Sequence, residues 1–304
     1  MRSTGNVSKT IRKWIDKWKS RVKVGKELGY ISSQIRSSNG YLARREIEII
    51  LEKLPKDESR LEKFGFKVYS QGDEDGVIEE IFGRLGVERG YFVEIGVGDG
   101  LECNSLYLLH KGWRGCWIER RVRNAVRMQE KFASIIPSRL NLLVENVTAE
   151  NIDALLRRCA PPNDVIDFLS IDIDGNDIYL LEALKLKPKL ICIEYNAKFP
   201  ANLSKKQTYD PHKSWRGTDY MGASLKAIAD VAVSKNYTLV GTNITGANAF
   251  LVRDDLAGDL FPYPCTPENL YNPPRYWLIS DHFSQIGHRA DFGPYADMDD
   301  SRPA

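Results

Sequence analysis

A glycine-rich turn is the pattern in this chain with the clearest chemical meaning. The apolar run from Tyr91 to Ile95 leads directly into the sequence GVGDG at residues 96–100. Glycines at alternate positions allow a tight turn from a strand to a helix, and they let the backbone approach a flat ligand because no Cβ intervenes. The spacing therefore predicts a nucleoside-binding turn.

The residues around this turn favour a cationic cofactor over a dinucleotide. Leu101 stands where a dinucleotide fingerprint needs glycine or alanine. The carboxylates of Glu94 and Asp99 would repel phosphates, whereas they suit the ammonium and sulfonium groups of S-adenosyl-L-methionine. Glu119 ends a second apolar run about twenty residues later, and its two oxygens match the two hydroxyls of a ribose. The predicted cofactor contacts are Gln71, Glu94, Gly96, Gly98, Asp99, Glu119, Asn146 and Asp172.

Two of these contacts have a purely structural alternative. Gln71 precedes a run of acids that is typical of the first turn of a helix. Asn146 lies just before Thr148 and Asn151, which are typical of a helix N-cap. Both alternatives stay open at the level of sequence.

A second group of polar residues follows two later strands. Asp172 and Asp174 come at the end of the run from Ile166 to Ile171, and Glu194 and Asn196 come at the end of the next one. Ligands bind at the carboxyl edge of open α/β sheets, and oxygen ligands suit Mg²⁺ or another divalent cation that could hold a hydroxyl group. The predicted metal ligands are Asp172, Glu194 and Asn196. The alternatives are a general base at Asp172 or Asp174, and helix capping by Asp174 and Asp177.

The segment from Lys198 to Leu225 has the composition of an acceptor site, that is, a site for the second substrate that would react with the cofactor. It mixes aromatic side chains such as Trp215 and Tyr220 with amides and both signs of charge, a combination that can stack on and orient a sugar. The alternative is that these aromatics fill a small core of their own. The histidines at 212, 282 and 288 are candidate bases, whereas His110 falls on a predicted helix. The predicted catalytic residues are Asp172, Asp174 and His282.

The elements that must position these residues are alternating strands and helices. Such alternation predicts an α/β fold with a mostly parallel sheet. The segment between the last two predicted strands is too short for a parallel crossover, so they should form an antiparallel hairpin. The predicted strands are Tyr91–Ile95, Gly115–Glu119, Leu140–Glu145, Ile166–Ile171, Leu190–Glu194, Tyr237–Gly241 and Ala247–Arg253.

The chain divides by composition into three parts. We expect residues 1–65 to form an N-terminal helical extension and residues 66–255 to form the α/β core. Residues 256–304 should form a proline-rich and aromatic extension that either caps the site or packs on the surface. Within residues 9–28, an apolar stripe at helical spacing is surrounded by bases, and a second helix is predicted from Tyr41 to Leu54. The stripe fits peripheral contact with an anionic membrane, or packing against its own domain or a second copy of the chain. Its members are Ile11, Trp14, Ile15, Trp18 and Val22.

Composition excludes several classes of protein. The net charge of +2 gives no global attraction to nucleic acid. Five scattered cysteines without a C-x-x-C pair fit reduced thiols, and no apolar run reaches the length of a membrane span. We therefore expect a cytoplasmic protein, with contact at the inner face of the membrane left open by the basic stripe.

Four segments together resemble the FkbM-like branch of class I S-adenosylmethionine-dependent methyltransferases. They are residues 92–100, 117–119, 169–177 and 193–196, and the similarity extends over about residues 68–253. The resemblance implies a Rossmann-like class I sheet with a terminal antiparallel hairpin, and O-methylation of sugar hydroxyls in glycoconjugates. It also implies that Asp172 and Glu194 correspond to metal ligands of metal-dependent O-methyltransferases, although Tyr195 separates Glu194 from Asn196.

The sequence thus predicts an O-methyltransferase that uses S-adenosyl-L-methionine, with or without Mg²⁺, on a saccharide or glycoconjugate acceptor. Two rivals remain. One is an NAD-linked or nucleotide-sugar-linked Rossmann enzyme, which Leu101 and the hairpin disfavour. The other is a non-catalytic scaffold at a membrane, which the intact acids disfavour.

Overall fold

The structure is a computed structural model that describes residues 4–55, 59–161, 165–212, 215–279 and 290–292. Within the first helix, the side chains of residues 4–13, 15, 16 and 18–20 lie outside the description. In chain order the elements are α1 (Thr4–Lys53), η1 (Leu61–Phe64), α2 (Glu74–Arg84), β1 (Tyr91–Ile95), α3 (Leu106–His110), β2 (Arg114–Ile118), α4 (Val122–Lys131), β3 (Leu140–Leu143), α5 (Ile152–Cys159), β4 (Phe168–Ile171), α6 (Asp177–Ala183), β5 (Leu190–Glu194), α7 (Leu225–Ser234), β6 (Tyr237–Thr242), β7 (Asn248–Arg253), α8 (Asp254–Ala257), η2 (Gly258–Leu260), α9 (Pro267–Leu270) and η3 (Tyr276–Leu278).

The strands form one sheet in the order β3-β2-β1-β4-β5-β7-β6. The pairs among the first five strands in this order are parallel, whereas β7 runs antiparallel to both β5 and β6. The predicted Rossmann-like α/β fold with a terminal antiparallel hairpin is confirmed. Because β1 and β4 are neighbours, the turns that follow them meet at one edge of the sheet.

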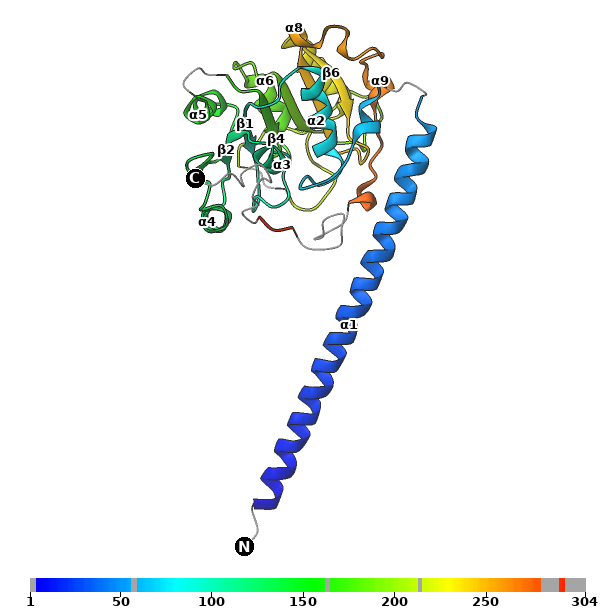
Figure 1. Cartoon of the computed structure of the whole chain (residues 1–304), viewed down its shortest axis with the longest axis vertical. Coiled ribbons are helices and arrows are strands. Elements are labelled where there is room, and N and C mark those ends of the chain that lie inside the picture. The colour runs from blue at the N-terminus through cyan, green and yellow to red at the C-terminus, as the bar shows by residue number, and fades with distance from the viewer. Residues whose placement is uncertain (1–3, 56–58, 162–164, 213–214, 280–289, 293–304) are drawn as a thin grey trace, which may run out of the picture.

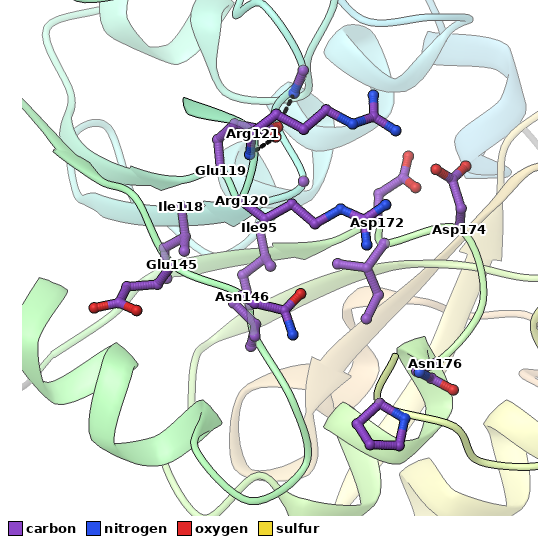
Figure 2. Close-up of a pocket in the computed structure, with 15 residues that line it drawn as sticks. Ile95, Ile118, Glu119, Arg120, Arg121, Glu145, Asn146, Asp172, Asp174 and Asn176 are labelled. Carbon is purple, nitrogen blue, oxygen red and sulfur yellow. Dashed lines mark hydrogen bonds between the residues drawn. The ribbon is translucent and has the colours of Figure 1, made fainter. Parts of the chain in front are cut away.

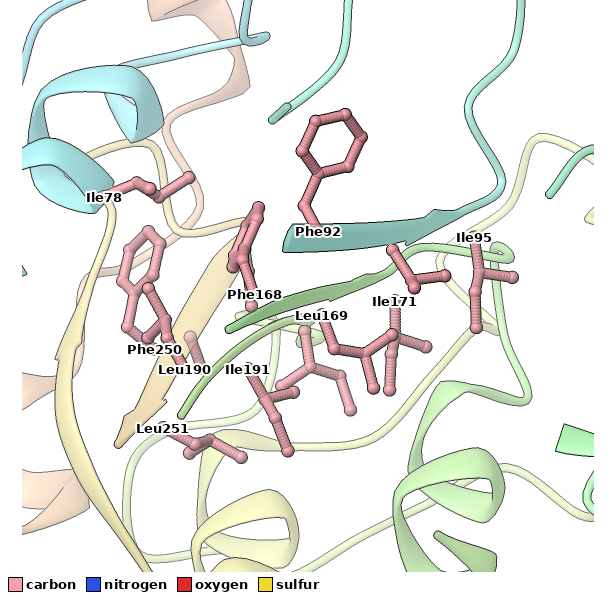
Figure 3. Packing of buried hydrophobic residues seen from close by; sticks show 14 of the residues in the cluster. Ile78, Phe92, Ile95, Phe168, Leu169, Ile171, Leu190, Ile191, Phe250 and Leu251 are labelled. Carbon is pink, nitrogen blue, oxygen red and sulfur yellow. The ribbon is translucent and has the colours of Figure 1, made fainter. Parts of the chain in front are cut away.

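The core lies on both faces of this sheet. Every residue of β4 is buried, and so are the first four residues of β5. Since successive side chains of a strand point to opposite faces, both faces must be covered. Figure 3 shows Phe92 and Phe168 packed on one side of the central strands, close to Ile78 of α2. This packing fixes the strand ends, from which the candidate site is built.

The N-terminal extension differs from the two predicted helices. Residues 4–53 form one continuous helix, α1, which leaves the folded domain and extends far beyond it (Figure 1). The residues that separated the two predicted helices, among them Gly29 and Gly40, are helical. A glycine inside a helix costs only about 1 kcal/mol, so it need not end one. Residues 21–30 are all exposed, so packing of this stretch on its own domain is wrong.

The end of α1 is attached to the C-terminal extension. The indole N–H of Trp277, in η3, donates a hydrogen bond to Glu46 over 2.9 Å. The extension itself packs against the sheet, because the hydroxyl of Tyr195 donates to the carbonyl of Asn272 over 2.7 Å, and that of Tyr271 donates to the carbonyl of Ala197 over 2.6 Å. The extension therefore links α1 to the carboxyl end of β5.

Two further expectations were tested by the structure. Cys116 of β2 and Cys159 of α5 form a disulfide with a Cα–Cα distance of 5.6 Å, whereas Cys103, Cys192 and Cys265 are free. The expectation that all five cysteines are unpaired is therefore wrong, because folding brings together two cysteines 43 residues apart in sequence. Among the described residues, no helix has the length and apolar character of a membrane span.

Candidate active site

A cavity of about 210 Å³ opens at the carboxyl ends of β1, β2, β3 and β4, where the predicted cofactor site lies (Figure 2). Its floor is apolar, with Ile95 and Ile118 at two strand ends, and its rim is polar. An apolar floor with a few polar groups at the rim is the usual form of a small-molecule site. The lining residues are Ile95, Gly96, Gly98, Ile118, Glu119, Arg120, Arg121, Glu145, Asn146, Val147, Asp172, Ile173, Asp174, Asn176 and Pro211.

The glycine turn needs its glycines for two different reasons. Gly96 has φ +87°, and a Cβ there would stand 1.6 Å from the carbonyl oxygen of Asp172. Gly98 has φ +66°, but a Cβ there would meet nothing within 4 Å. Gly96 therefore lets the turn after β1 pass close to the turn after β4, whereas Gly98 leaves space beside the cavity.

Glu119 joins the glycine turn to the end of β2. One of its carboxylate oxygens accepts a hydrogen bond from the backbone N–H of Gly98 at 3.0 Å, and the other accepts from the N–H of Arg121 at 2.7 Å. The side chain is buried, yet it lines the cavity. A carboxylate held from both sides has a fixed orientation and still has lone pairs left for a diol.

Three predicted cofactor contacts lie outside the lining of this cavity. Glu94 is buried and accepts hydrogen bonds from the backbone N–H groups of Asn104 and Ser105 and from the Ser105 hydroxyl. Burial raises the pKa of Glu94 above its ordinary value. Asp99 and Gln71 are exposed. Glu94 thus supports the segment that leads into α3, and its two oxygens already have partners there.

Asn146 lines the cavity, as predicted from its place after β3. The structural alternative also describes part of this loop. The side chain of Asn151 accepts from the N–H of Thr148 at 2.8 Å and donates to the carbonyl of Asn146 at 2.9 Å. Asn151 therefore fixes the backbone of Asn146, which leaves the Asn146 side chain on the cavity wall.

The acid cluster consists of Asp172, Asp174 and Glu194. Each side chain offers one oxygen, and these oxygens all lie within 4.8 Å of one another. Figure 2 shows the carboxylates of Asp172 and Asp174 side by side at the cavity. The Oε2 atom of Glu194 is buried and has no hydrogen-bond partner. A buried oxygen without a partner is costly, and a proton or a cation bound at this atom would remove that cost.

The electrostatics of the cluster point in the same direction. Burial raises the pKa of Asp172 well above its usual value, and the charges of Asp177 and Asp174 raise it further. Burial likewise raises the pKa of Glu194, with Asp172 as the strongest neighbouring charge. Such a group must share a proton or bind a cation. An all-oxygen set of this size fits a hard divalent ion.

The loop after β4 is shaped to present Asp174. Its backbone has φ +58°, a left-handed conformation that aspartate tolerates better than most residues. Asp177 holds this loop, since its two oxygens accept from the N–H groups of Ile173 at 2.8 Å and Gly175 at 2.7 Å. Burial raises the pKa of Asp177 to about 6. Neither Asp174 nor Asp177 is the N-cap of α6, which is Asn176 and makes no side-chain cap hydrogen bond; Asp177 fixes the loop before the helix, and Asp174 lines the cavity.

Asn196, a predicted metal ligand, has its polar atoms engaged outside the acid cluster. Asn196 is buried, and its amide donates to the carbonyls of Asp219 and Met221, both at 2.9 Å, while its oxygen accepts from the N–H of Lys198. It therefore anchors the segment after β5, and Asp174 occupies the place beside Asp172 and Glu194. His282 lies outside the described residues.

Sequence reasoning missed part of the cavity wall. Arg120 and Arg121 line it directly after Glu119, and in Figure 2 Arg120 extends across the cavity toward Asp172. Pro211 lines it from the segment after β5, which is tied to α6 because the Asn176 amide donates to the carbonyl of Asp210 at 2.7 Å. The position of two bases just beyond the strand tip was a usable signal for Arg120 and Arg121.

Two aromatic side chains of the predicted acceptor segment, those of Trp215 and Tyr220, are exposed. Trp215 and Tyr220 both show about half of their surface, and the Trp215 indole N–H donates to the carbonyl of Thr218 over 2.6 Å. They do not form a buried core of their own. In the C-terminal extension, burial and then the charge of Glu194 raise the pKa of Tyr276 to about 12.

His110 has the structural role that its helical position predicted. Its ring stacks on Tyr69 with centroids 5.4 Å apart and contacts Phe292 at 5.3 Å.

Comparison with known proteins gives similarity only at the level of structure. No family model matches the chain, and no curated protein matches it. A candidate caffeoyl-CoA O-methyltransferase from Staphylococcus aureus is 16% identical, covers 70% of this chain and 99% of its own, and has a TM-score of 0.43. An O-methyltransferase of tomaymycin synthesis from Streptomyces achromogenes, solved with SAM, is 17% identical, with 66% and 92% coverage and a TM-score of 0.39. The magnesium protoporphyrin IX methyltransferase of Synechocystis, solved with SAH, is 13% identical, with 62% and 89% coverage and a TM-score of 0.39. Likeness at this level does not by itself define an activity.

Proposed function

We propose that this chain is an S-adenosyl-L-methionine-dependent O-methyltransferase of the FkbM-like kind, acting on a hydroxyl of a sugar or glycoconjugate. The observation that carries the proposal is one cavity with two chemically different sides. Glu119 and the glycine turn form one side, and the acid cluster of Asp172, Asp174 and Glu194 adjoins the other. A cofactor and an acceptor need to meet at such a boundary.

On the cofactor side, the residues suit a nucleoside. Glu119 is held by the N–H groups of Gly98 and Arg121, so its remaining lone pairs can accept the ribose hydroxyls without reorganisation. Ile95, Ile118 and Val147 supply apolar walls for a base, and Asn146 supplies an amide. When bound, S-adenosyl-L-methionine supplies an activated methyl group on a sulfonium centre.

On the acceptor side, the acid cluster is suited to a hydroxyl group. Asp172, Asp174 and Glu194 would hold a divalent cation, which would lower the pKa of a coordinated hydroxyl. Asp172 lines the cavity itself, so its carboxylate is placed to orient the acceptor or take its proton. The exposed rings of Trp215 and Tyr220 offer flat surfaces on which a sugar could stack.

Ligand titration tests the cofactor assignment. We expect calorimetric titration of the full chain to detect S-adenosyl-L-methionine or its demethylated product, with much weaker binding of NAD and NADP. Tight binding of a dinucleotide in place of S-adenosyl-L-methionine would instead support the NAD-linked alternative, for which Arg120 and Arg121 offer phosphate partners.

The variant Asp172→Asn tests the acceptor side. It keeps the shape of the side chain but removes a charge and a base, so turnover should fall by about 10²-fold or more, while the affinity for S-adenosyl-L-methionine changes little. The assay is transfer of labelled methyl to a panel of saccharide acceptors, with and without a chelator. Asp230→Asn, an exposed change on α7, is the control. Full activity of Asp172→Asn would refute this role.

A further inference from the structure

The first part of α1 concentrates most of the positive charge of the molecule. Residues 9–26 contain eight bases and one acid, a net charge of +7, whereas the whole chain carries +2. The remaining residues therefore carry a net charge of −5. The bases are Lys9, Arg12, Lys13, Lys17, Lys19, Arg21, Lys23 and Lys26.

This part of α1 is held away from the rest of the molecule. The helix has 50 residues, so at 1.5 Å per residue it is about 75 Å long. Near its C-terminal end it meets the folded domain, where Glu46 accepts from Trp277, and in the part of the chain that the structure describes its N-terminal half extends away from that domain (Figure 1). Residues 21–30 are exposed, and Trp14 shows 76% of its surface. At this exposure most of the Trp14 side chain is left uncovered by the described residues.

The charge does not surround the helix evenly. The stripe of residues 11, 14, 15, 18 and 22 recurs at three- and four-residue spacing, and α1 is helical throughout this range. Of its members, Trp14 and Val22 have described side chains, and both are exposed. At 100° per residue, the eight bases fall on the remaining faces of the helix. The segment thus has an apolar face bordered by positive charge.

We propose that residues 9–28 of α1 dock on the surface of an anionic lipid bilayer, with the helix axis in the plane of the interface. An apolar face with tryptophan matches the boundary between headgroups and acyl chains, and the surrounding bases complement anionic headgroups. The net negative charge of the remaining residues keeps the folded domain from competing for the same surface.

Charge also decides against a second copy of the chain as the occupant. A parallel pair of α1 helices would bring two segments of +7 side by side, which is unfavourable. A nucleic acid would satisfy the bases but would leave the apolar face in water. A bilayer satisfies both parts of the segment at once.

The proposal is tested by co-sedimentation of the full-length protein with lipid vesicles. Vesicles of phosphatidylcholine with about 30% phosphatidylglycerol should bind the protein at least ~10-fold more strongly than pure phosphatidylcholine. Binding should weaken when salt is raised from ~0.1 M to ~1 M, because the screening length falls from about 10 Å to about 3 Å. Equal binding to both kinds of vesicle, or none to either, would overturn the proposal.

Matched variants assign the contact to this segment. The triple variant Lys17→Glu, Arg21→Glu and Lys23→Glu should reduce binding to anionic vesicles by ~10-fold or more, and Trp14→Ala should reduce it several-fold. The control Arg127→Glu, Lys185→Glu and Lys205→Glu makes the same change in net charge at exposed positions of the folded domain, and should bind like the unaltered protein.

Two further measurements complete the test. Circular dichroism and calorimetric binding of S-adenosyl-L-methionine check that each variant is folded. Because vesicle binding is measured separately, the membrane proposal can fail while the proposed catalytic activity holds, and the reverse is also possible. Light scattering reports the mass of the protein in solution. The proposal would be overturned if the protein were a dimer in solution and did not bind vesicles, and if either the triple charge reversal or Trp14→Ala dissociated that dimer. Such a result would show that a second copy of the chain covers this face.

Discussion

Carboxylates buried near one edge of the sheet dominate the chemistry of individual residues in this molecule. Asp75 illustrates the cost. Its Oδ2 atom accepts from the N–H groups of Val68, Tyr69 and Ser70 at 2.6 to 2.9 Å, but its Oδ1 atom is buried without a partner. Burial raises the pKa of Asp75 to about 6. The charged form is therefore tolerated in the fold at a cost in stability.

The variant Asp75→Asn should change how stability depends on pH. A folded-state pKa raised from 3.8 to about 6 means that the folded protein binds this proton more tightly than the unfolded chain. The associated stabilisation is complete below pH 3.8 and is lost as pH rises through about 6. The free energy of unfolding falls by about 3 kcal/mol as this group changes from protonated to charged, and the Asp75→Asn variant would not show this fall.

Chemical unfolding of both proteins from pH 4 to pH 7 measures this difference. The unaltered protein should lose stability relative to Asp75→Asn across the range, because the amide oxygen can still accept the three backbone hydrogen bonds. Glu130→Gln, at an exposed position of α4, serves as the control and should follow the unaltered protein. Parallel pH profiles for Asp75→Asn and the unaltered protein would contradict the burial of an ionisable carboxyl.

At the scale of elements, the contact between two turns fixes the candidate site. The turns after β1 and β4 touch at Gly96 and Asp172, where a Cβ would stand 1.6 Å from a carbonyl oxygen. The same strand ends carry Ile95 and Ile173, which line the cavity. A change in this contact must therefore displace the acid cluster relative to the glycine turn.

Gly96→Ala and Gly98→Ala should separate steric contact from backbone strain. Both glycines have positive φ, so each alanine carries the left-handed penalty of about 1–2 kcal/mol. Gly96→Ala also forces two backbone segments apart, so its free energy of unfolding should fall by several kcal/mol more. Urea unfolding of the two variants measures the difference. Similar losses for both would show that the turns do not touch as described.

Much of this arrangement follows from the sequence, for identifiable reasons. The strands were predictable because short runs of β-branched, aromatic or other apolar residues alternate with helical segments, and each predicted strand matches an observed one within a few residues. Continuous α1 was not predictable, because Gly29, Gly40 and the serines between them resemble a break. The orientation of Asn196 was not predictable either, since it depends on carbonyls of residues 219 and 221 that only the folded loop brings near.

Within the site, strand ends were predictable but side-chain directions were not. Glu94 and Glu119 both sit at the ends of strands beside the glycine turn, yet one supports the segment before α3 and the other lines the cavity. The difference depends partly on partners distant in sequence: Ser105 lies 11 residues from Glu94, and Gly98 lies 21 residues from Glu119. Asp174 was predicted as a catalytic residue and not as a metal ligand, and its place beside Asp172 depends on a left-handed turn after β4 that the spacing does not reveal.

At the scale of the whole molecule, the long helix and the folded domain are nearly independent. The hydrogen bond between Trp277 and Glu46 lies close to the C-terminal end of α1, and residues 21–30 have no burial to lose. Removing the exposed part should therefore cost the domain little.

Deletion of residues 1–40 should leave the melting temperature of the domain within about 2 °C of that of the full chain. This shift corresponds to a change of less than ~1 kcal/mol in the free energy of unfolding. Deletion through Pro55 should lower it further, because that change also removes Glu46 and its bond to Trp277. Thermal unfolding followed by calorimetry makes the comparison. A large drop for the shorter deletion would mean that the first forty residues contribute to the domain's stability.

The order of the strands divides the work of the cavity between two halves of the chain. The turns after β1, β2 and β3 build the wall with Glu119 and Asn146, whereas the turn after β4 carries Asp172 and Asp174, and β5 ends at Glu194. The segment that follows β5, residues 198–224, is a single uninterrupted stretch of chain. Under the proposed function, exchanging that stretch for another of different shape should change which hydroxyl compound is accepted, whereas the turns after β1, β2 and β3 would keep Glu119 and Asn146 in place.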